Sequence, residues 1–148
     1  MTLTMTVPNV LLVDDEIAFV ETMSKRLTRR NLNILIAHSG TEALDVMASE
    51  ENPVEVVILD VKMPGMDGIE VLEDIKRKYP LVEVIMLTGH ATVSSAIDGM
   101  KKGAFDYLLK PCDTNELVEK VNQAASRKRE HENKVIEARM KEIMRGRA

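Results

Sequence analysis

Residues 54–60 read Val-Glu-Val-Val-Ile-Leu-Asp, a short apolar run rich in β-branched side chains that ends in an aspartate. A run of this length and composition is typical of a strand buried on both faces of a parallel sheet. Helical patterns separate it from three similar runs, each of which also ends in polar residues. These are residues 10–13 before Asp14 and Asp15, residues 84–87 before Thr88, and residues 107–109 before Lys110. The alternation predicts an α/β fold with a parallel sheet.

Five strands and five helices are expected in strict alternation. The strands are placed at about residues 9–14, 33–37, 54–60, 82–88 and 106–110. Caps and turn residues bound the five helices. The first spans about 16–30, the second runs from Ser39 or Thr41 to Asn52-Pro53, and the third follows the turn residues 64–68 and ends at Tyr79-Pro80. The fourth ends at Gly103, and the fifth begins at Asp113 or Thr114. Because βαβ crossovers are right-handed, we predict a doubly wound five-stranded sheet of the flavodoxin-like order 2-1-3-4-5, with an extended C-terminal helix.

Composition and charge narrow the class of protein. The 148 residues support one domain with a short extension, and no apolar stretch approaches the ~18 residues of a transmembrane helix. Residues 1–8 lack a basic leader segment and Cys112 is the only cysteine, so we expect a cytoplasmic protein without an internal disulfide. Residues 126–148 carry +4 and the whole chain −4, which leaves −8 on residues 1–125. An acidic body argues against direct nucleic-acid or membrane binding and favours a divalent cation.

The last helical pattern continues beyond the predicted sheet. Its first part offers an apolar docking face, at Leu117, Val118, Val121, Ala124 and Ala125. From Ser126 onward apolar residues become sparse, and their roughly heptad spacing covers about two heptads, fewer than a coiled coil needs. We therefore divide the chain into a domain of residues 1–125 and a basic helical extension or linker of residues 126–148. Whether the extension is a solvated helix, a dimerising coil or an interdomain linker stays open.

The polar residues that follow the strands are expected to meet. The carboxyl ends of parallel strands share one edge of a sheet, where α/β proteins bind ligands, so Asp14, Asp15, Asp60, Thr88 and Lys110 should converge there. An aspartate can attack phosphorus and form an acyl phosphate, and Mg²⁺ binds both carboxylates and phosphate oxygens. An ammonium and a hydroxyl can bind the remaining oxygens. The sequence thus predicts a site for Mg²⁺ and a phosphoryl group, with a candidate cis peptide at its Lys-Pro bond, residues 110–111.

Four separated motifs carry a resemblance to a known family. They read Val-Asp-Asp-Glu at 13–16, Leu-Asp-Val-Lys-Met-Pro-Gly-Met-Asp-Gly at 59–68, Leu-Thr-Gly-His at 87–90 and Gly-Ala-Phe-Asp-Tyr-Leu-Leu-Lys-Pro at 103–111. In this order and at these spacings they make residues 8–125 similar to the receiver domains of two-component response regulators. The last two motifs look closest to the receivers of transcription activators of the nitrogen-regulation type.

The resemblance implies a signalling switch that catalyses only its own phosphorylation and dephosphorylation. By that resemblance Asp60 is the phosphoacceptor, and a sensor histidine kinase or phosphotransfer protein is the donor. Asp15 and Asp60 are implied to bind Mg²⁺ directly, and Asp14 to hold a metal-bound water. The main-chain carbonyl of Lys62 is implied to complete the protein's share of the ligands.

The same resemblance supplies a switching mechanism. Thr88 and Lys110 are implied to bind the phosphoryl group, and Tyr107 to be the aromatic partner of Thr88. Since a phosphoryl group adds charge and acceptor oxygens, Thr88 can move toward it and leave space for the Tyr107 ring. The face made by the fourth helix, fifth strand and fifth helix then repacks and signals to an effector protein or domain. Lys62 and His90 are expected to tune the lifetime of the aspartyl phosphate.

Further partner surfaces follow from the resemblance. The fourth and fifth helices, or the C-terminal helix, are candidate surfaces for a homodimer, and the oligomeric state stays open. The kinase is expected to dock on the first helix, at Phe19, Met23, Arg26 and Leu27.

Three other functions compete with this one. A phosphatase of the haloacid-dehalogenase type needs an acid two residues after its nucleophile, where this chain has Lys62. A flavodoxin-like nucleotide binder needs a loop of small residues after its first strand, where this chain has acidic residues 14–16. An inactive receiver that serves only as a scaffold is the third alternative. The output is left open, because the chain fits both a single-domain regulator and the receiver and linker of a larger protein.

Overall fold

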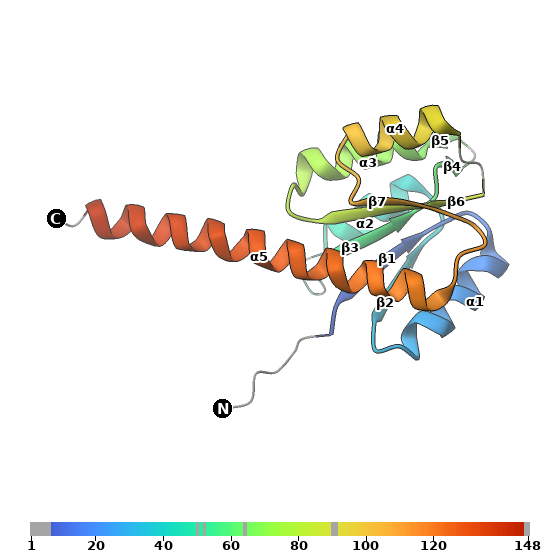
Figure 1. Cartoon of the computed structure of the whole chain (residues 1–148), viewed down its shortest axis with the longest axis horizontal. Coiled ribbons are helices and arrows are strands. Elements are labelled where there is room, and N and C mark those ends of the chain that lie inside the picture. The colour runs from blue at the N-terminus through green and yellow to red at the C-terminus, as the bar shows by residue number, and fades with distance from the viewer. Residues whose placement is uncertain (1–6, 50, 52, 64, 90–91, 147–148) are drawn as a thin grey trace.

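The computed structural model describes residues 7–49, 51, 53–63, 65–89 and 92–146. Its centre is a five-stranded parallel sheet in the order β2-β1-β3-β6-β7 (Figure 1). The strands are β1 (Asn9–Val13), β2 (Asn33–Ala37), β3 (Val56–Leu59), β6 (Glu83–Thr88) and β7 (Asp106–Leu109). Since β4 (Lys62–Met63) and β5 (Met66–Asp67) form a separate small hairpin, the central order is the predicted 2-1-3-4-5, and the fold class is confirmed.

Helices cover both faces of the sheet, as the crossover rule requires. On one face, α1 (Ile17–Thr28) and the start of α5 (Thr114–Gly146) pack on side chains that include Val10 and Leu12. On the other face, α2 (Gly40–Met47) and α3 (Gly68–Lys78) pack on side chains that include Leu11 and Val13. Successive residues of β1 thus pack into two separate hydrophobic cores, one on each face of the sheet. This explains why the strands are continuous apolar runs rather than alternating apolar and polar residues.

Local hydrogen bonds fix the starts of the helices that follow the strands. Of the two candidate caps for α2, Ser39 serves, because its side chain accepts a hydrogen bond from the Glu42 N–H. Asp67 caps α3 by accepting from the Ile69 N–H, at 3.0 Å. The sequence predicts a loop just before α3, but residues 66–67 form β5, in which Asp67 pairs with Lys62 of β4.

Two helices expose apolar residues that lie at helical spacing. On α1 the later apolar residues are buried, but Ile17 is 61% exposed because it begins the helix at the rim of the sheet. On α4 (Val93–Lys101) the apolar residues Val93, Ile97 and Met100 are exposed, the first of them by 79%, and the buried residue is Gly99. Helical periodicity predicts a face, but it does not say which face the neighbouring elements cover.

The last helix is continuous from Thr114 to Gly146 and runs well past the body (Figure 1). Its predicted docking face is confirmed, since Leu117, Val121, Ala124 and Ala125 are buried. Farther along, the apolar side chains are exposed, at Val135, Ile136, Met140, Ile143 and Met144. Within the described residues no helix combines the length and apolar character needed to cross a membrane.

The start of α3 lies tightly against the backbone that follows β3. The Gly68 N–H donates to the Val61 carbonyl at 2.7 Å, and a Cβ at position 68 would lie 2.7 Å from the Val61 Cα and closer still to the Asp60 carbonyl oxygen. Only glycine fits this approach without a shift of the backbone that carries Asp60.

The substitution Gly68→Ala is therefore expected to destabilise the fold. Forcing a methyl group against main-chain atoms should lower the free energy of unfolding by about 1–3 kcal/mol. Urea unfolding would measure the change. Gly146→Ala is the matched control, because its added Cβ meets no atom within 4 Å and its stability should be unchanged. Equal stability of the two variants would contradict this account of α3.

Candidate functional site

Hydrogen bonds of the sheet continue one residue past the strands and hold three site residues at its carboxyl edge. The Asp14 N–H donates to the Ala37 carbonyl at 3.1 Å, and the Asp60 N–H donates to the Val13 carbonyl at 3.1 Å. The Lys110 N–H donates to the carbonyl of the residue that ends β6, at 2.9 Å. The Lys110–Pro111 peptide is cis, as the sequence suggested. The backbone therefore delivers two carboxylates and an ammonium to one place.

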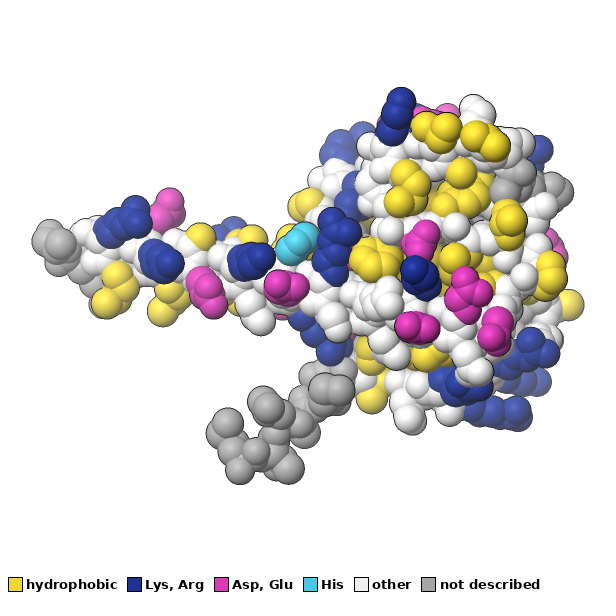
Figure 2. Space-filling view, viewed as in Figure 1, with side chains coloured by type: hydrophobic (Ala, Val, Ile, Leu, Met, Phe, Trp, Pro, Cys, Tyr) yellow, Lys and Arg dark blue, Asp and Glu magenta, His cyan; other side chains and the backbone are white. Residues whose placement is uncertain are grey.

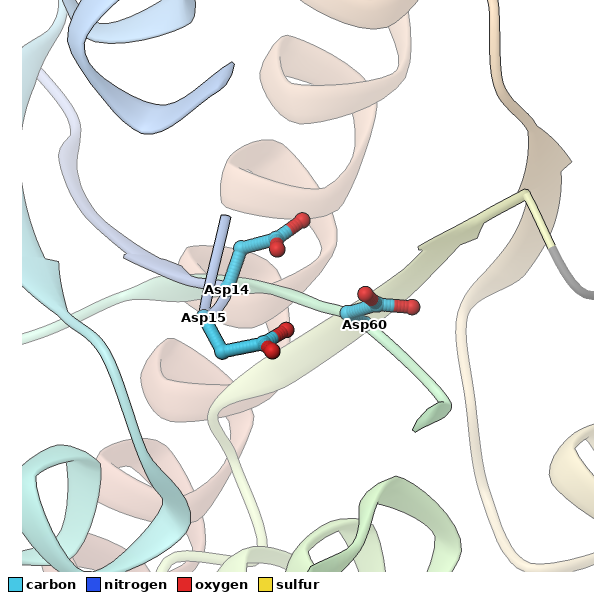
Figure 3. A group of neighbouring side chains, drawn as sticks. All are labelled: Asp14, Asp15 and Asp60. Atoms are coloured by element: carbon cyan, nitrogen blue, oxygen red, sulfur yellow. The ribbon is translucent and has the colours of Figure 1, made fainter. Parts of the chain in front are cut away.

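Three carboxylates meet at this edge. Ligand atoms of Asp14, Asp15 and Asp60 all lie within 4.8 Å of one another, and Figure 3 shows the first two reaching from the end of β1 toward the third. Asp14 and Asp60 are buried and Asp15 is half-buried. Negative charges this close repel one another strongly away from water. Clustered carboxylate oxygens open to solvent on one side suit a hard divalent cation such as Mg²⁺, which keeps several of its waters.

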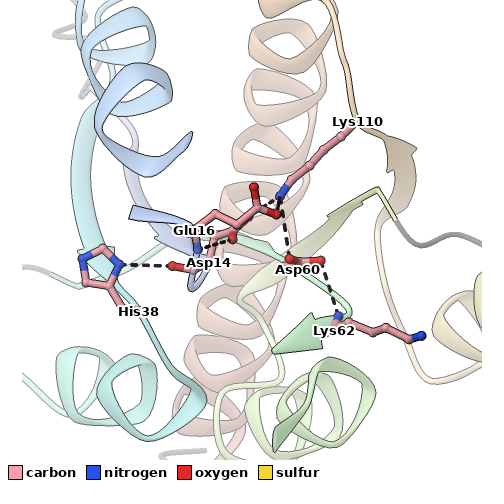
Figure 4. A network of polar contacts seen from close by, with 6 residues as sticks. All are labelled: Asp14, Glu16, His38, Asp60, Lys62 and Lys110. Atoms are coloured by element: carbon pink, nitrogen blue, oxygen red, sulfur yellow. Dashed lines mark hydrogen bonds and ion pairs between the residues drawn. The ribbon is translucent and has the colours of Figure 1, made fainter. Parts of the chain in front are cut away.

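Lys110 supplies positive charge to the same place (Figure 4). Its Nζ lies 2.5 Å from Asp14 Oδ2, 3.5 Å from Glu16 Oε1 and 3.7 Å from Asp60 Oδ2. The ring of Phe19 covers the ammonium at 4.0 Å from the ring centre, a cation–π contact. Burial acts to lower the pKa of Lys110, but the hydrogen bond to Asp14 and the surrounding carboxylates raise this pKa above its usual value. The ammonium therefore stays charged at neutral pH.

Asp14 shows what burial at this edge does to a carboxyl group. Burial raises its pKa above the usual value, and the charge of Asp60 acts in the same direction. The hydrogen bonds that it accepts from Lys110 and from the Glu16 N–H, the latter at 2.9 Å, oppose the rise without cancelling it. His38 Nδ1 lies 3.1 Å from the Asp14 carbonyl oxygen and holds the main chain at this point. The fold therefore disfavours the ionised form of Asp14, and a further cation nearby would stabilise it.

Thr88 and Tyr107 lie on neighbouring strands. Thr88 is fully buried at the end of β6, and Tyr107 of β7 pairs with Met86, two residues earlier on β6. Since side chains alternate along a strand, Thr88 and Tyr107 project from the same face of the sheet. The Tyr107 hydroxyl lies 2.9 Å from Ser95 Oγ in the first turn of α4, and its ring borders Gly99. Tyr107, on the same face of the sheet as Thr88, is thus linked to α4 by the contact of its hydroxyl with Ser95.

Lys62 contacts Asp60 through its main chain. Its N–H donates to Asp60 Oδ1 at 3.4 Å, and its side chain points away from the carboxylates (Figure 4). His90, the other residue expected to tune the phosphoryl lifetime, lies outside the described residues.

Sequence reasoning missed several contacts and misread one surface. His38 could have been found, because β1–β2 pairing of Val13 with Ala37 places the residues after them side by side. The proposed kinase-docking set on α1 is wrong for Met23 and Leu27, since both are buried in the core. Their spacing is that of the inward stripe of α1, so they cannot meet a partner at the surface.

Comparison with known proteins shows what the chain resembles. The family model of the response regulator receiver domain matches residues 10–122. A response regulator of Rickettsia bellii described as NtrX-like is 40% identical over 116 residues, 77% of this chain and 24% of that protein. The DNA-binding transcriptional regulator NtrC of Klebsiella pneumoniae is 36% identical over 121 residues, 82% of this chain and 25% of that protein. The chain thus spans about a quarter of the length of these curated relatives.

Solved structures agree with the sequence matches. A receiver domain protein of Clostridium thermocellum is 37% identical and superposes with a TM-score of 0.78, covering 83% of this chain and 98% of that one. The receiver domain of NtrX from Brucella abortus is 26% identical with a TM-score of 0.73, covering 79% of this chain and 98% of that one.

The raised pKa of Asp14 predicts a stability effect when divalent cations are removed with EDTA. Asp14→Asn is expected to raise the free energy of unfolding at neutral pH, because the folded protein disfavours the ionised carboxylate that the unfolded chain readily forms. The gain should vanish toward low pH, where the carboxyl is protonated in both states. It should grow as the pH rises from 3.8 through the raised pKa and then stay constant.

Urea unfolding across this pH range would measure the effect. Asp45→Asn is the control, since it makes the same chemical change on an exposed side chain of α2 and should leave stability unchanged. If Asp14→Asn were less stable than the parent at neutral pH, the ion pair with Lys110 would outweigh burial, contrary to this account.

Proposed function

This chain belongs to the response regulator receiver family, whose members are signalling switches, and from that premise we propose that Asp60 is its phosphoacceptor. The supporting observation is the placement of Asp60 among Asp14, Asp15 and Lys110 at the carboxyl edge of the sheet. A histidine kinase or phosphotransfer protein would donate the group. An Asp60 Oδ atom bonds to phosphorus as the phosphorus–nitrogen bond of the donor's phosphohistidine breaks, and the histidine nitrogen keeps the electron pair.

The residues around Asp60 fit Mg²⁺ as the cofactor. We assign Asp15 and Asp60 as direct ligands, Asp14 as the residue that holds a metal-bound water, and the Lys62 carbonyl as a main-chain ligand. The Lys62 main chain lies beside Asp60, to which its N–H donates at 3.4 Å. When bound, Mg²⁺ neutralises phosphoryl oxygens and carboxylates together. Lys110 would act separately from the metal ion, by binding the phosphoryl group itself. Its ammonium, already 3.7 Å from Asp60 Oδ2, can bind a phosphoryl oxygen and weaken its hold on Asp14.

We propose that Thr88 and Tyr107 carry the change outward. Thr88 would donate its hydroxyl to a phosphoryl oxygen, and Tyr107 would follow into the space vacated on the same face of the sheet. Because the Tyr107 hydroxyl contacts Ser95, its movement pulls on the first turn of α4, where Ser95 and Thr92 form a capping box. A change from 1% to 99% active requires about 5.5 kcal/mol, which a few charge-assisted hydrogen bonds can supply.

The output surface is proposed to be the α4–β7–α5 face. Several of its apolar residues are exposed: Val93, Ile97 and Met100 on α4, and Leu109 at the end of β7. An effector protein or domain, or a second copy of the chain, would bind there or along the exposed apolar residues of α5. The division into a receiver of residues 1–125 and an extension of residues 126–148, and a location in the cytoplasm, remain parts of this proposal.

The phosphoacceptor role predicts a covalent product. Incubation with acetyl phosphate and Mg²⁺ should add one phosphoryl group to the protein, measured by intact mass. The adduct should be absent in Asp60→Asn and after chelation of Mg²⁺, because the nucleophile or the cation is then missing. No adduct on the parent chain would favour an inactive scaffold, and an adduct that survives in Asp60→Asn would place the phosphoacceptor elsewhere.

The switch predicts a loss of response in Tyr107→Ala. Beryllofluoride, a mimic of the acyl phosphate, should shift the amide resonances of α4 in the parent chain, measured by NMR. The shift on α4 should be lost in the variant, while shifts beside Asp60 persist, because binding of the mimic does not need the ring. Tyr79→Ala removes a half-buried tyrosine at the end of α3 and should keep the full response. A full response of α4 in Tyr107→Ala would remove the proposed role of Tyr107.

A further inference from the structure

Two buried glutamates lie at the amino edge of the sheet, opposite the phosphoacceptor site. Glu55 precedes β3 and Glu83 begins β6, and they are only 8% and 5% exposed. The two strands are neighbours, and the Glu83 N–H donates to the Glu55 carbonyl at 3.2 Å. Buried carboxylates are rare unless they are paired, and the mechanism above uses neither of these. Their partners therefore indicate what they do.

Both glutamates bind arginines of α5. Arg129 forms a bidentate pair with Glu55: its Nε lies 2.8 Å from Oε2 and its Nη2 2.8 Å from Oε1. The second contact is looser: Arg127 Nε lies 3.2 Å from Glu83 Oε2, which makes an ion pair without a hydrogen bond, and the Arg127 side chain is 54% exposed. On its other side Glu83 Oε1 lies 3.3 Å from the Nζ of Lys76, which comes from α3. Bidentate arginine–carboxylate pairs fix geometry more strictly than point charges do.

The two arginines hold α5 from opposite flanks. The side of α5 that faces the sheet runs through Leu117, Val121 and Ala124 and continues to Lys128, whose side chain is 13% exposed. Arg127 and Arg129 stand on either side of Lys128, and residues two apart on a helix point in nearly opposite directions. One therefore reaches β6 and the other β3. Rolling the helix about its axis in either direction would stretch one of the two pairs.

Charge around Glu55 is consistent with a tight pair. Burial alone would raise the pKa of Glu55, but the hydrogen bonds and charge of Arg129, with a contribution from Lys128, lower it below the usual value. Arg127 also lies over the ring of Phe105, 5.6 Å from its centre. Arg127 and Arg129 thus each contact a buried glutamate of the body, although the Arg127 side chain is itself 54% exposed.

The position of these pairs along α5 is informative. The buried apolar face of the helix ends at Ala125, and the pairs follow within four residues, where the helix leaves the body (Figure 1). Figure 2 shows the remainder of α5 extending from the body with basic, acidic and apolar side chains on its surface. An isolated helical segment of this kind is marginal in water, because helices gain most of their stability from tertiary packing. The pairs supply a contact at the point where apolar packing stops.

We propose that Glu55, Glu83, Arg127 and Arg129 form an ionic clasp that fixes the direction and rotation of the α5 extension relative to the body. The extension then leaves as a rigid continuation of the domain. Its exposed apolar residues at 135–144 are presented at one angle to any partner. The role proposed for the clasp is geometric: ion pairs of partly exposed arginines add little net stability, but the bidentate contact of Arg129 with Glu55 fixes an orientation.

Distance measurements between spin labels test the clasp. Labels are placed at Glu21→Cys on α1 and Lys141→Cys on the extension, both exposed positions, in a Cys112→Ser background of the full chain. Double electron–electron resonance should give one narrow distance distribution. In Arg127→Gln/Arg129→Gln the narrow distribution should be lost, and amide hydrogen exchange of residues 126–132 should become faster.

Two further variants make the outcome decisive. Glu55→Gln/Glu83→Gln removes the same pairs from the body side without changing α5, so it should lose the narrow distribution as well. Lys134→Gln/Arg139→Gln removes two exposed charges from α5 outside the clasp and should keep it. A distribution that stays narrow in both clasp variants would overturn the proposal and assign the direction of the extension to helix continuity alone. Broadening in the arginine variant only would also overturn it, because the glutamates would then have no part.

Discussion

Repulsion among Asp14, Asp15 and Asp60 is the constraint on which the site depends. The parallel ladder holds two of these carboxylates one residue past their strands, so they cannot separate without breaking main-chain hydrogen bonds. Lys110 relieves part of the repulsion by contacting Asp14 and Asp60 together. Burial, with a smaller contribution from the charge of Asp60, still keeps the pKa of Asp14 above its usual value. The fold therefore maintains an excess of negative charge that a cation and a phosphoryl group can use.

This excess links stability to function. A buried carboxylate that resists ionisation destabilises the metal-free fold, yet the same carboxylate is what attracts a divalent cation. Lys110 is then shared between two tasks, since it neutralises Asp14 at rest and is the ammonium nearest Asp60 for an arriving phosphoryl group. A site with fewer acids would fold more easily and bind the cation less well. Such a conflict is common where a protein keeps charges for chemistry rather than for packing.

Much of this arrangement follows from the sequence, and the part that does not has a physical reason. Strands are predictable because central strands must be apolar on both faces, and the run 56–59 that forms β3 is buried at every residue. The convergence of Asp14, Asp60 and Lys110 follows because parallel strands end at one edge. The exposed stripe of α4 could not be predicted, since periodicity does not reveal which side a helix turns to the body. Nor could the contact of Tyr107 with Ser95, which depends on the distance between two separate elements.

Glu55 and Glu83 were hidden for a different reason. Each stands at the start of an apolar run, where a glutamate is usually solvated, and their arginine partners lie 74 and 44 residues away. The two edges of the sheet consequently have opposite charge balances. At the carboxyl edge, three acids contact Lys110 and Asp15 lies beside two of them; at the amino edge, two glutamates face three basic side chains, those of Lys76, Arg127 and Arg129. The first edge carries an excess of negative charge and can therefore respond to a cation or a phosphoryl group. At the second edge each carboxylate has a cation beside it, so this edge can hold the extension in place while the first one changes.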